Sequence, residues 1–250
     1  MKRSTIVLVF MFVIILFSQM SLYGLKPIKL ATVNWAPYYG ENLQNQGFVT
    51  DLAKEAFKRA GYSMTVEFVP WKRALELAKK GDYDGLLGAY YNEKRKEYFQ
   101  YSIPISSANV VIIRKKSLML PNKLYKLKDL AKYKFGTING YSYGKEFDNA
   151  TFIKKDVSPN LETNLIKLYK GRYDLAVVSR EVMLNLIQTK HPEYKGQFVE
   201  LAPKLVENNL YIAISKKIKN STKITNDFNA AFKSMQKDGT VNKILKKYGM

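Results

Sequence analysis

The sequence predicts an α/β fold made of two lobes that are joined by two crossings of the chain. Short apolar runs alternate with stretches of helical periodicity, which is typical of α/β proteins. Two β-branched runs, residues 108–114 and 210–214, are expected to lead the chain out of the first lobe and back into it. A chain of 250 residues is long enough for two lobes of about 100 residues each. We therefore expect the first lobe at residues 25–113 and 210–250, and the second at 114–209.

Residues 1–24 are predicted to be a signal peptide. Lys2 and Arg3 precede an apolar run, residues 6–17, which has the length of a signal-peptide core and is short for a membrane span. No A-x-A pattern marks a cleavage site, and an uncleaved membrane anchor is the alternative. The chain has no cysteine that could carry a lipoprotein anchor. We therefore expect export to the periplasm.

Composition excludes several classes of function. The formal charge is +20, from 41 Lys and Arg against 21 Asp and Glu, and it can steer anionic ligands. The lysines are dispersed and no nucleic-acid-binding motif occurs, so no nucleic-acid partner is expected. The single histidine, His191, is expected at the surface without partners. The sequence has no thiol, no cluster of metal-ligand spacing and no glycine-rich phosphate motif, so we expect no catalytic site, metal or cofactor. We also expect a monomer.

The stretch from Trp71 to Ile105 holds the first candidate site. Apolar residues at helical spacing predict a helix that ends near Gly81, and the short apolar run 85–89 predicts a buried parallel strand. Tyr90 to Arg95 follow this strand at its carboxyl end, where open α/β sheets place their ligands.

The motifs around this strand resemble those of bacterial extracellular solute-binding proteins of family 3, the amino-acid receptors of ABC transporters. The matching motifs are GDYDG at 81–85, YSIP at 101–104, GFVTDL at 47–52 and the C-terminal run 224–249. The resemblance covers about residues 26–249. It implies a two-lobed periplasmic-binding-protein-like fold of type II, whose two hinge crossovers let the lobes close on a ligand.

In the first lobe, the resemblance implies a clamp for a ligand carboxylate. Arg95 matches the family's carboxylate-binding arginine, with a solvated cation as the alternative. Trp35 and Trp71 match the positions that hold the ligand between two aromatic rings, and Tyr38 follows Trp35 in the matching loop. The alternative is that both tryptophans belong to the core. Arg73 is a further candidate anion contact.

In the second lobe, a glycine turn at 139–144 is expected to lead into a helix whose N-terminal N–H groups favour an anion. The resemblance places Tyr141 and Ser142 against the ligand carboxylate. The alternative for Ser142 is a role as helix N-cap, which it can have in place of ligand binding or together with it. Ser179 stands where amino-acid receptors carry the acid that pairs with an α-ammonium. Tyr90 also departs from the small residue of relatives, so the pocket is expected to be more aromatic and less anionic than usual.

The sequence as a whole predicts an exported protein that captures a small carboxylate-bearing solute, such as an amino acid, for import with an ABC transporter permease. Two alternatives remain open. One is a sensor that works with a separate signalling protein, and the other is an enzyme similar to cyclohexadienyl dehydratases, which share this fold.

Overall fold

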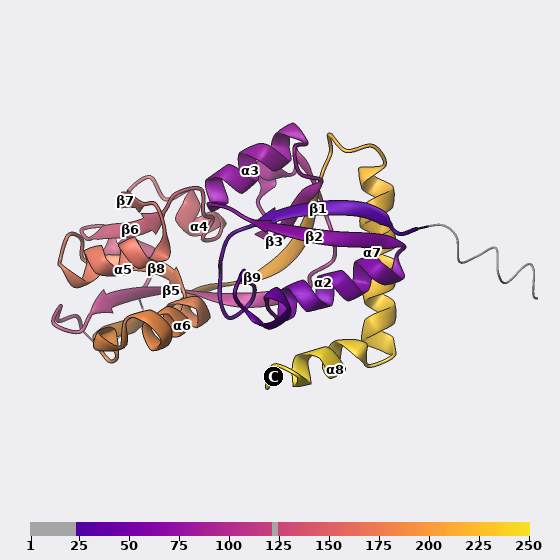
Figure 1. Ribbon diagram of the computed structural model, residues 1–250. Helices are drawn as coiled ribbons and strands as arrows, with labels where there is room; N and C mark the ends of the chain where they lie inside the picture. The colour runs from indigo at the N-terminus through magenta and orange to yellow at the C-terminus, as the bar shows by residue number, and fades with distance from the viewer. Residues whose placement is uncertain (1–23, 122–124) are drawn as a thin grey trace, which may run out of the picture.

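The computed structural model describes residues 24–121 and 125–250 as two α/β lobes on one nine-stranded sheet (Figure 1). The strand order is β2-β1-β3-β9-β5-β8-β6-β7, and β4 also pairs with β9. Apart from Gly24, the predicted signal peptide lies outside the described residues. Within the described part of the chain, no helix is both long and apolar enough to cross a membrane.

The first lobe combines the N-terminal part of the chain with its C-terminal helices. Strand β1 pairs in parallel with β2 and β3, as expected for strands that are joined through helices. The elements of this lobe are β1 (Lys26–Thr32), η1 (Gln44–Gln46), α2 (Phe48–Arg59), β2 (Tyr62–Phe68), α3 (Trp71–Lys80), β3 (Gly85–Tyr90), η2 (Glu93–Arg95), β4 (Phe99–Tyr101), α7 (Ser221–Lys237) and α8 (Thr240–Lys246).

The second lobe repeats the parallel arrangement with shorter elements. Strand β6 pairs in parallel with β7 and β8. The elements of this lobe are η3 (Leu127–Leu130), β6 (Lys134–Ile138), α4 (Lys145–Asp148), β7 (Lys154–Ser158), α5 (Leu161–Tyr169), β8 (Leu175–Ser179), α6 (Arg180–Lys190) and η4 (Pro192–Tyr194).

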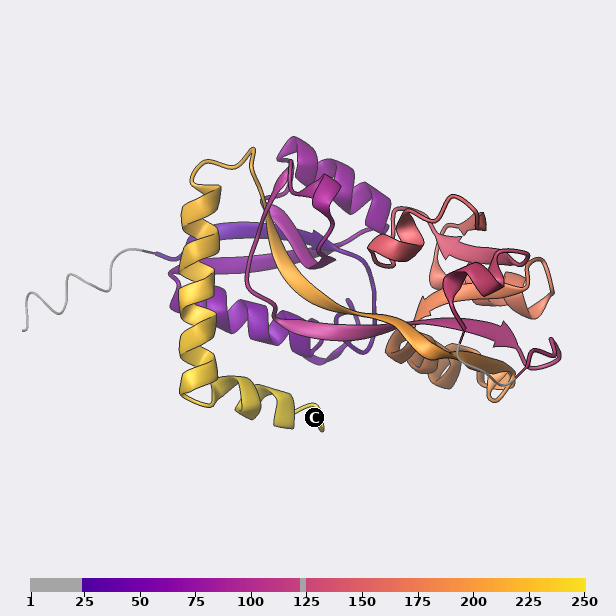
Figure 2. The same cartoon turned by 180° about the vertical axis from the view of Figure 1, so that it is seen from behind.

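Two long strands, β5 (Ser106–Lys115) and β9 (Phe198–Ser215), join the lobes. They pair antiparallel from Ser106 opposite Leu210 to Lys115 opposite Phe198. Beyond this ladder, β9 pairs with β3 and β4 of the first lobe, whereas β5 pairs with β8 of the second. Figure 2 shows the two strands running side by side from one lobe into the other. The two crossings are therefore a two-stranded ribbon.

Both lobes use the same motif to enter their central strand. Gly81 and Gly171 follow helices α3 and α5 with φ of +91° and +68°, a left-handed conformation that glycine adopts without strain. Three residues later, the Asp84 carboxylate accepts a hydrogen bond from the Lys29 N–H at 2.7 Å. The Asp174 carboxylate does the same for Lys134 at 2.9 Å. The two aspartates thus hold strand entries together and have a structural role.

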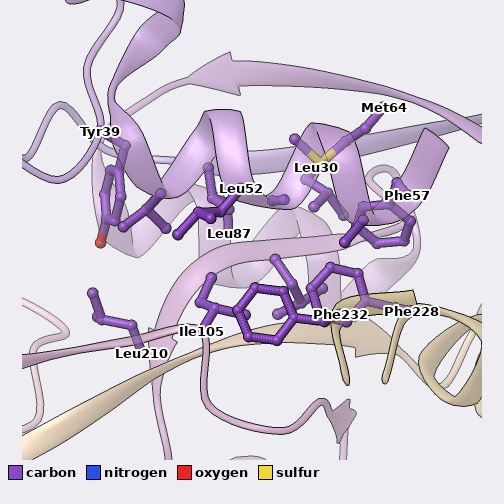
Figure 3. Close-up of a cluster of buried hydrophobic side chains, with 14 of the residues drawn as sticks. Leu30, Tyr39, Leu52, Phe57, Met64, Leu87, Ile105, Leu210, Phe228 and Phe232 are labelled. Carbon is purple, nitrogen blue, oxygen red and sulfur yellow. The ribbon is translucent and has the colours of Figure 1, made fainter. Parts of the chain in front are cut away.

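The core of the first lobe lies between the sheet and helices α2 and α7 (Figure 3). Phe57 of α2 meets Phe228 of α7 with ring centroids 4.8 Å apart, and Phe228 stacks on Phe232 at 5.9 Å. Each of these buried rings contributes about 3 kcal/mol of hydrophobic stabilisation. They fix helix α7 on the first lobe.

The segment Leu127–Leu130 forms a single 3₁₀ turn, and both of its leucines are buried. One expectation outside the site was wrong in part. His191 has partners. Its Nε2 lies 2.8 Å from Glu162 and its Nδ1 lies 2.9 Å from Glu193, and hydrogen bonds to these two carboxylates raise its pKa.

Candidate functional site

A small cavity of about 30 Å³ lies where the two lobes meet, and we call it the cleft cavity. The first lobe contributes the carboxyl ends of β1 and β3, the edge at which α/β sheets bind ligands. The second lobe contributes the loop after β6. The residues that line the cleft cavity are Val33, Trp35, Tyr39, Trp71, Gly88, Tyr90, Arg95, Tyr141 and Ser142.

Trp35 is held in place by a tight turn that follows β1. Its N–H donates to the Tyr39 carbonyl at 2.8 Å, and the Tyr38 N–H donates back to the Trp35 carbonyl at 3.1 Å. The Trp35 ring stacks on Tyr39 at 5.5 Å and lies 4.8 Å from the ring of Tyr38. Tyr38 itself is buried and does not line the cleft cavity. Burial and the nearby Glu181 carboxylate raise the pKa of the Tyr38 hydroxyl.

Gly88 and Tyr39 line the cleft cavity and were missed in the sequence. Strand β3 has a bulge between Leu87 and Ala89, and Gly88 within it has a φ of +75°. The Tyr39 hydroxyl donates to the Gly88 carbonyl at 3.3 Å, and its ring covers the position that a Cβ would take. A glycine inside a strand pattern was the available signal, because it indicates a bulge or the close approach of another group.

Trp71 and Arg95 converge on one carbonyl of the second lobe. Trp71 is the first residue of α3, and its Nε1 donates to the Gly140 carbonyl at 3.1 Å. Arg95 ends η2, and its Nη2 donates to the same oxygen at 2.7 Å. The guanidinium carbon lies 5.8 Å from the centroid of the Trp71 ring. The arrangement holds the guanidinium at the boundary between the lobes.

The Arg95 side chain is a cation that has lost much of its water. This desolvation lowers its pKa from the usual value, and the nearby Tyr101 and Asp148 act in the opposite direction. In the part of the chain that the structure describes, the guanidinium pairs with no carboxylate. A desolvated cation with only a neutral acceptor is suited to bind an anion.

The second-lobe loop differs from the predicted helix entry. Helix α4 begins at Lys145 with Gly144 as its N-cap, so Ser142 does not cap it. The Ser142 hydroxyl donates to the Asp148 carboxylate, which also accepts from the Tyr143 N–H at 2.9 Å. The Asp148 carboxylate therefore accepts hydrogen bonds from groups that were expected to face a ligand. Ser142 still lines the cleft cavity, where Asn92 of the first lobe donates to its oxygen at 3.3 Å.

A second, narrower space of about 10 Å³, which we call the apolar hollow, adjoins the cleft cavity and shares the rings of Trp35, Tyr90 and Tyr141 with it. Its other lining residues are Val110, Ile138, Tyr143, Leu161, Val178 and Ser179. Ser179 thus belongs to this part of the site. Arg73 is exposed on α3 and lines neither space. Of the nine predicted site residues, the structure brings together Trp35, Trp71, Tyr90, Arg95, Tyr141, Ser142 and Ser179.

Comparison with protein families gives a match over residues 28–250, nearly the whole described chain, to bacterial extracellular solute-binding proteins, family 3. The chain belongs to this family. A similar characterised protein is the arginine-binding extracellular protein ArtP of Bacillus subtilis (strain 168), which is 26% identical over 231 residues, or 90% of this chain and 87% of ArtP.

Solved structures with the same fold include two binding proteins and a sensor domain. The substrate-binding protein of an amino acid ABC transporter superposes with a TM-score of 0.71 at 19% identity, covering 88% of this chain and 98% of that one. An ancestral arginine-binding protein bound to arginine gives 0.71 at 23% identity, covering 88% and 97%. A histidine kinase sensor domain with similarity to periplasmic binding proteins gives 0.75 at 17% identity, covering 89% and 95%. The predicted two-lobed periplasmic-binding-protein-like fold is confirmed.

Proposed function

We propose that this protein is an exported receptor that captures a small carboxylate-bearing solute between its lobes and delivers it to an ABC transporter permease. One observation carries the proposal: Arg95 is desolvated in the cleft cavity, and its acceptor is the neutral carbonyl of Gly140. A carboxylate is a stronger acceptor for a guanidinium than a peptide carbonyl is. A ligand carboxylate beside Arg95 therefore gains a charge-assisted hydrogen bond of about 1.5–3 kcal/mol.

The aromatic walls supply the rest of the binding energy. Trp35 and Trp71 line the same cavity from different elements of the first lobe, and Tyr141 adds a ring from the second lobe, 6.4 Å from Trp71. Rings of this kind contribute apolar area and stacking of about 0.5–1.5 kcal/mol for each pair. A ligand of micromolar affinity needs about −8 kcal/mol in total. Burial of apolar ligand area against these rings has to supply what the charge-assisted contact and the stacking do not.

The ribbon of β5 and β9 is the proposed hinge. It is the only pair of strands that runs between the lobes among the described residues, so rotation of the lobes must be absorbed there. In this proposal the lobes are residues 25–113 with 210–250, and residues 114–209. Closure on a ligand then presents both lobes at once to the permease.

The family and the named relatives support an amino acid or a related carboxylate as the solute, because ArtP is named for arginine binding. Export to the periplasm through the first 24 residues is part of the same proposal, as is binding without chemical turnover. The ligand and the transport partner are what the experiments must identify.

The proposal is tested by a thermal-shift screen of the purified protein against amino acids and other carboxylates, each paired with its uncharged amide. A carboxylate at 100 times its dissociation constant stabilises the folded protein by about 2.7 kcal/mol, a shift of about 5–11 °C in Tm for a chain of this size. We expect carboxylates to act and their amides not to act. Arg95→Gln should reduce the shift by about half or more, and the exposed Arg172→Gln is the control that should keep it in full. Equal shifts with acids and amides would refute the carboxylate clamp.

Closure and turnover need two further measurements. Small-angle scattering should show a more compact protein with the active carboxylate, and an unchanged profile would contradict capture by closure. Chromatography of the ligand after long incubation should return it unaltered. Conversion of the ligand would instead favour an enzyme.

A further inference from the structure

We propose that the ligand is a monocarboxylate with an uncharged, largely apolar body, and that this body packs against the residues that line the apolar hollow, with an oxygen against the Tyr90 hydroxyl. The inference rests on the proposed function, because it assumes that Arg95 holds the carboxylate. It differs from what the names of the relatives suggest, since arginine carries two cationic groups besides its carboxylate. Three observations support it: the charge of the walls, the engagement of the nearby acids, and one buried hydroxyl.

The first observation is the charge of the lining. Arg95 is the one ionised side chain among the residues that line the cleft cavity and the apolar hollow, and none of these residues is Asp or Glu. A site with a single positive charge is complementary to a monoanion. An ammonium or guanidinium in the ligand would be desolvated there without a counter-charge, which is strongly unfavourable.

The second observation concerns the two acids that lie behind these walls. Asp148 accepts from the Ser142 hydroxyl with one oxygen and from the Tyr143 N–H with the other. Glu181 accepts from the Asn109 side chain at 2.7 Å with one oxygen, and from the Asn109 N–H at 3.2 Å with the other. Both carboxylates are therefore engaged by groups of the chain.

Ser179 stands between Glu181 and the apolar hollow. Its hydroxyl lies 3.4 Å from a Glu181 oxygen, and Ser179 itself lines the hollow. A cationic ligand would have to share the Glu181 oxygens with the groups that already donate to them. The serine thus presents a neutral surface at the place where a counter-charge would be needed.

The third observation is the hydroxyl of Tyr90, which is buried between the two spaces. In the described part of the chain no group meets it with hydrogen-bond geometry. Burial raises its pKa strongly, and the nearby Ser179 hydroxyl acts weakly in the opposite direction. The hydroxyl therefore stays protonated and has a proton to donate. A buried donor of this kind favours a ligand oxygen opposite it, because a lost hydrogen bond is costly in an apolar site.

The remaining walls of the hollow are aliphatic. Val110, Ile138 and Val178 are buried and Leu161 is half-buried, and they come from β5, β6, β8 and the start of α5. Flanked by the rings of Trp35 and Tyr141, they form an apolar lining. An acid whose apolar body carries one hydroxyl or carbonyl oxygen satisfies all three observations.

The test uses four probes in titration calorimetry with the wild-type protein: 3-(4-hydroxyphenyl)propanoate, 3-phenylpropanoate, L-tyrosine and L-arginine. The first probe and L-tyrosine differ only in the α-ammonium. We expect 3-(4-hydroxyphenyl)propanoate to bind at least tenfold more tightly than L-tyrosine, and L-arginine to bind more weakly still. Tyr90→Phe should remove most of the advantage of the hydroxylated acid over 3-phenylpropanoate while the protein stays folded.

Two results would overturn the inference. If L-tyrosine or L-arginine binds as tightly as the ammonium-free acid, and Arg95→Gln weakens that binding, the receptor proposal stands and the uncharged body is refuted. If none of the four probes binds while a carboxylate with a charged or strongly polar body does, the apolar-body class is likewise refuted. If no carboxylate binds at all, the proposed function itself fails.

Discussion

Replacing Gly88 with alanine tests whether the bulge in β3 holds the aromatic wall of the cleft cavity. A Cβ at Gly88 would lie 2.4 Å from Cε1 of Tyr39, and φ at this position is +75°. The left-handed backbone costs an alanine about 1–2 kcal/mol, partly offset by about 0.4–1 kcal/mol of lower unfolded-state entropy. Overlap with a buried ring adds about 1–3 kcal/mol. We therefore expect Gly88→Ala to destabilise the protein by about 3 kcal/mol.

Gly171→Ala is the matched control for this substitution. Its φ is +68°, but no atom lies within 4 Å of the position of its Cβ, so it has only the backbone cost of about 1 kcal/mol. Thermal unfolding should show a fall in Tm of about 6–12 °C for Gly88→Ala against about 2–4 °C for Gly171→Ala. Tryptophan fluorescence should change only in Gly88→Ala, because Tyr39 supports Trp35. Equal losses of stability in the two variants would refute the role assigned to the Tyr39 contact.

Two more predictions concern charged groups. Hydrogen bonds from Thr240 and Arg59 lower the pKa of Asp238 to about 2. The ionised carboxylate therefore stabilises the folded protein above the usual carboxylate pKa of about 4, and this stabilisation is lost as the pH falls toward 2. The Tm difference between the wild type and Asp238→Asn should therefore be constant above about pH 5 and fall to a small part of that value near pH 2; a difference that keeps its full size at pH 2 would contradict this origin. Asp148→Asn should lower the free energy of unfolding by about 1 kcal/mol, because it weakens the hydrogen bonds from Ser142 and Tyr143. It should also raise the affinity for a carboxylate several-fold, because it removes a negative charge near Arg95. Denaturation and calorimetry on the same samples check the two signs, and weaker carboxylate binding would show that Asp148 supports the site instead of competing with it.

The repeating parts of the fold could be predicted because local sequence determines them. The apolar run 85–89 is too short for a helix and is bounded by glycines, and it forms β3. The two motifs that contain Asp84 and Asp174 form equivalent strand entries in the two lobes. The two β-branched runs form parts of β5 and β9. Each of these features depends on spacing and residue type within about a dozen positions of the chain.

The parts of the site that could not be predicted depend on contacts between distant segments. Asp148 takes the Ser142 hydroxyl because α4 is only four residues long, and nothing in the glycine turn indicates where that short helix begins. Arg73 and Arg95 are both plausible anion contacts by type, and only the packing of α3 leaves Arg73 in solvent. The shared acceptor of Trp71 and Arg95, the Gly140 carbonyl, lies in the other lobe and has no sequence signature.

The central claim is that Arg95 binds a carboxylate between the lobes. The most direct test takes the tightest-binding carboxylate of the screen and compares its affinity for the wild-type protein with its affinity for Arg95→Gln. Calorimetry gives both dissociation constants, and the fluorescence of Trp35 and Trp71, the only tryptophans of the chain, reports binding in the cleft cavity itself. Loss of a charge-assisted hydrogen bond of about 1.5–3 kcal/mol predicts that affinity falls by about 10- to 150-fold. An unchanged dissociation constant in Arg95→Gln, with the fluorescence response retained, would contradict the claim.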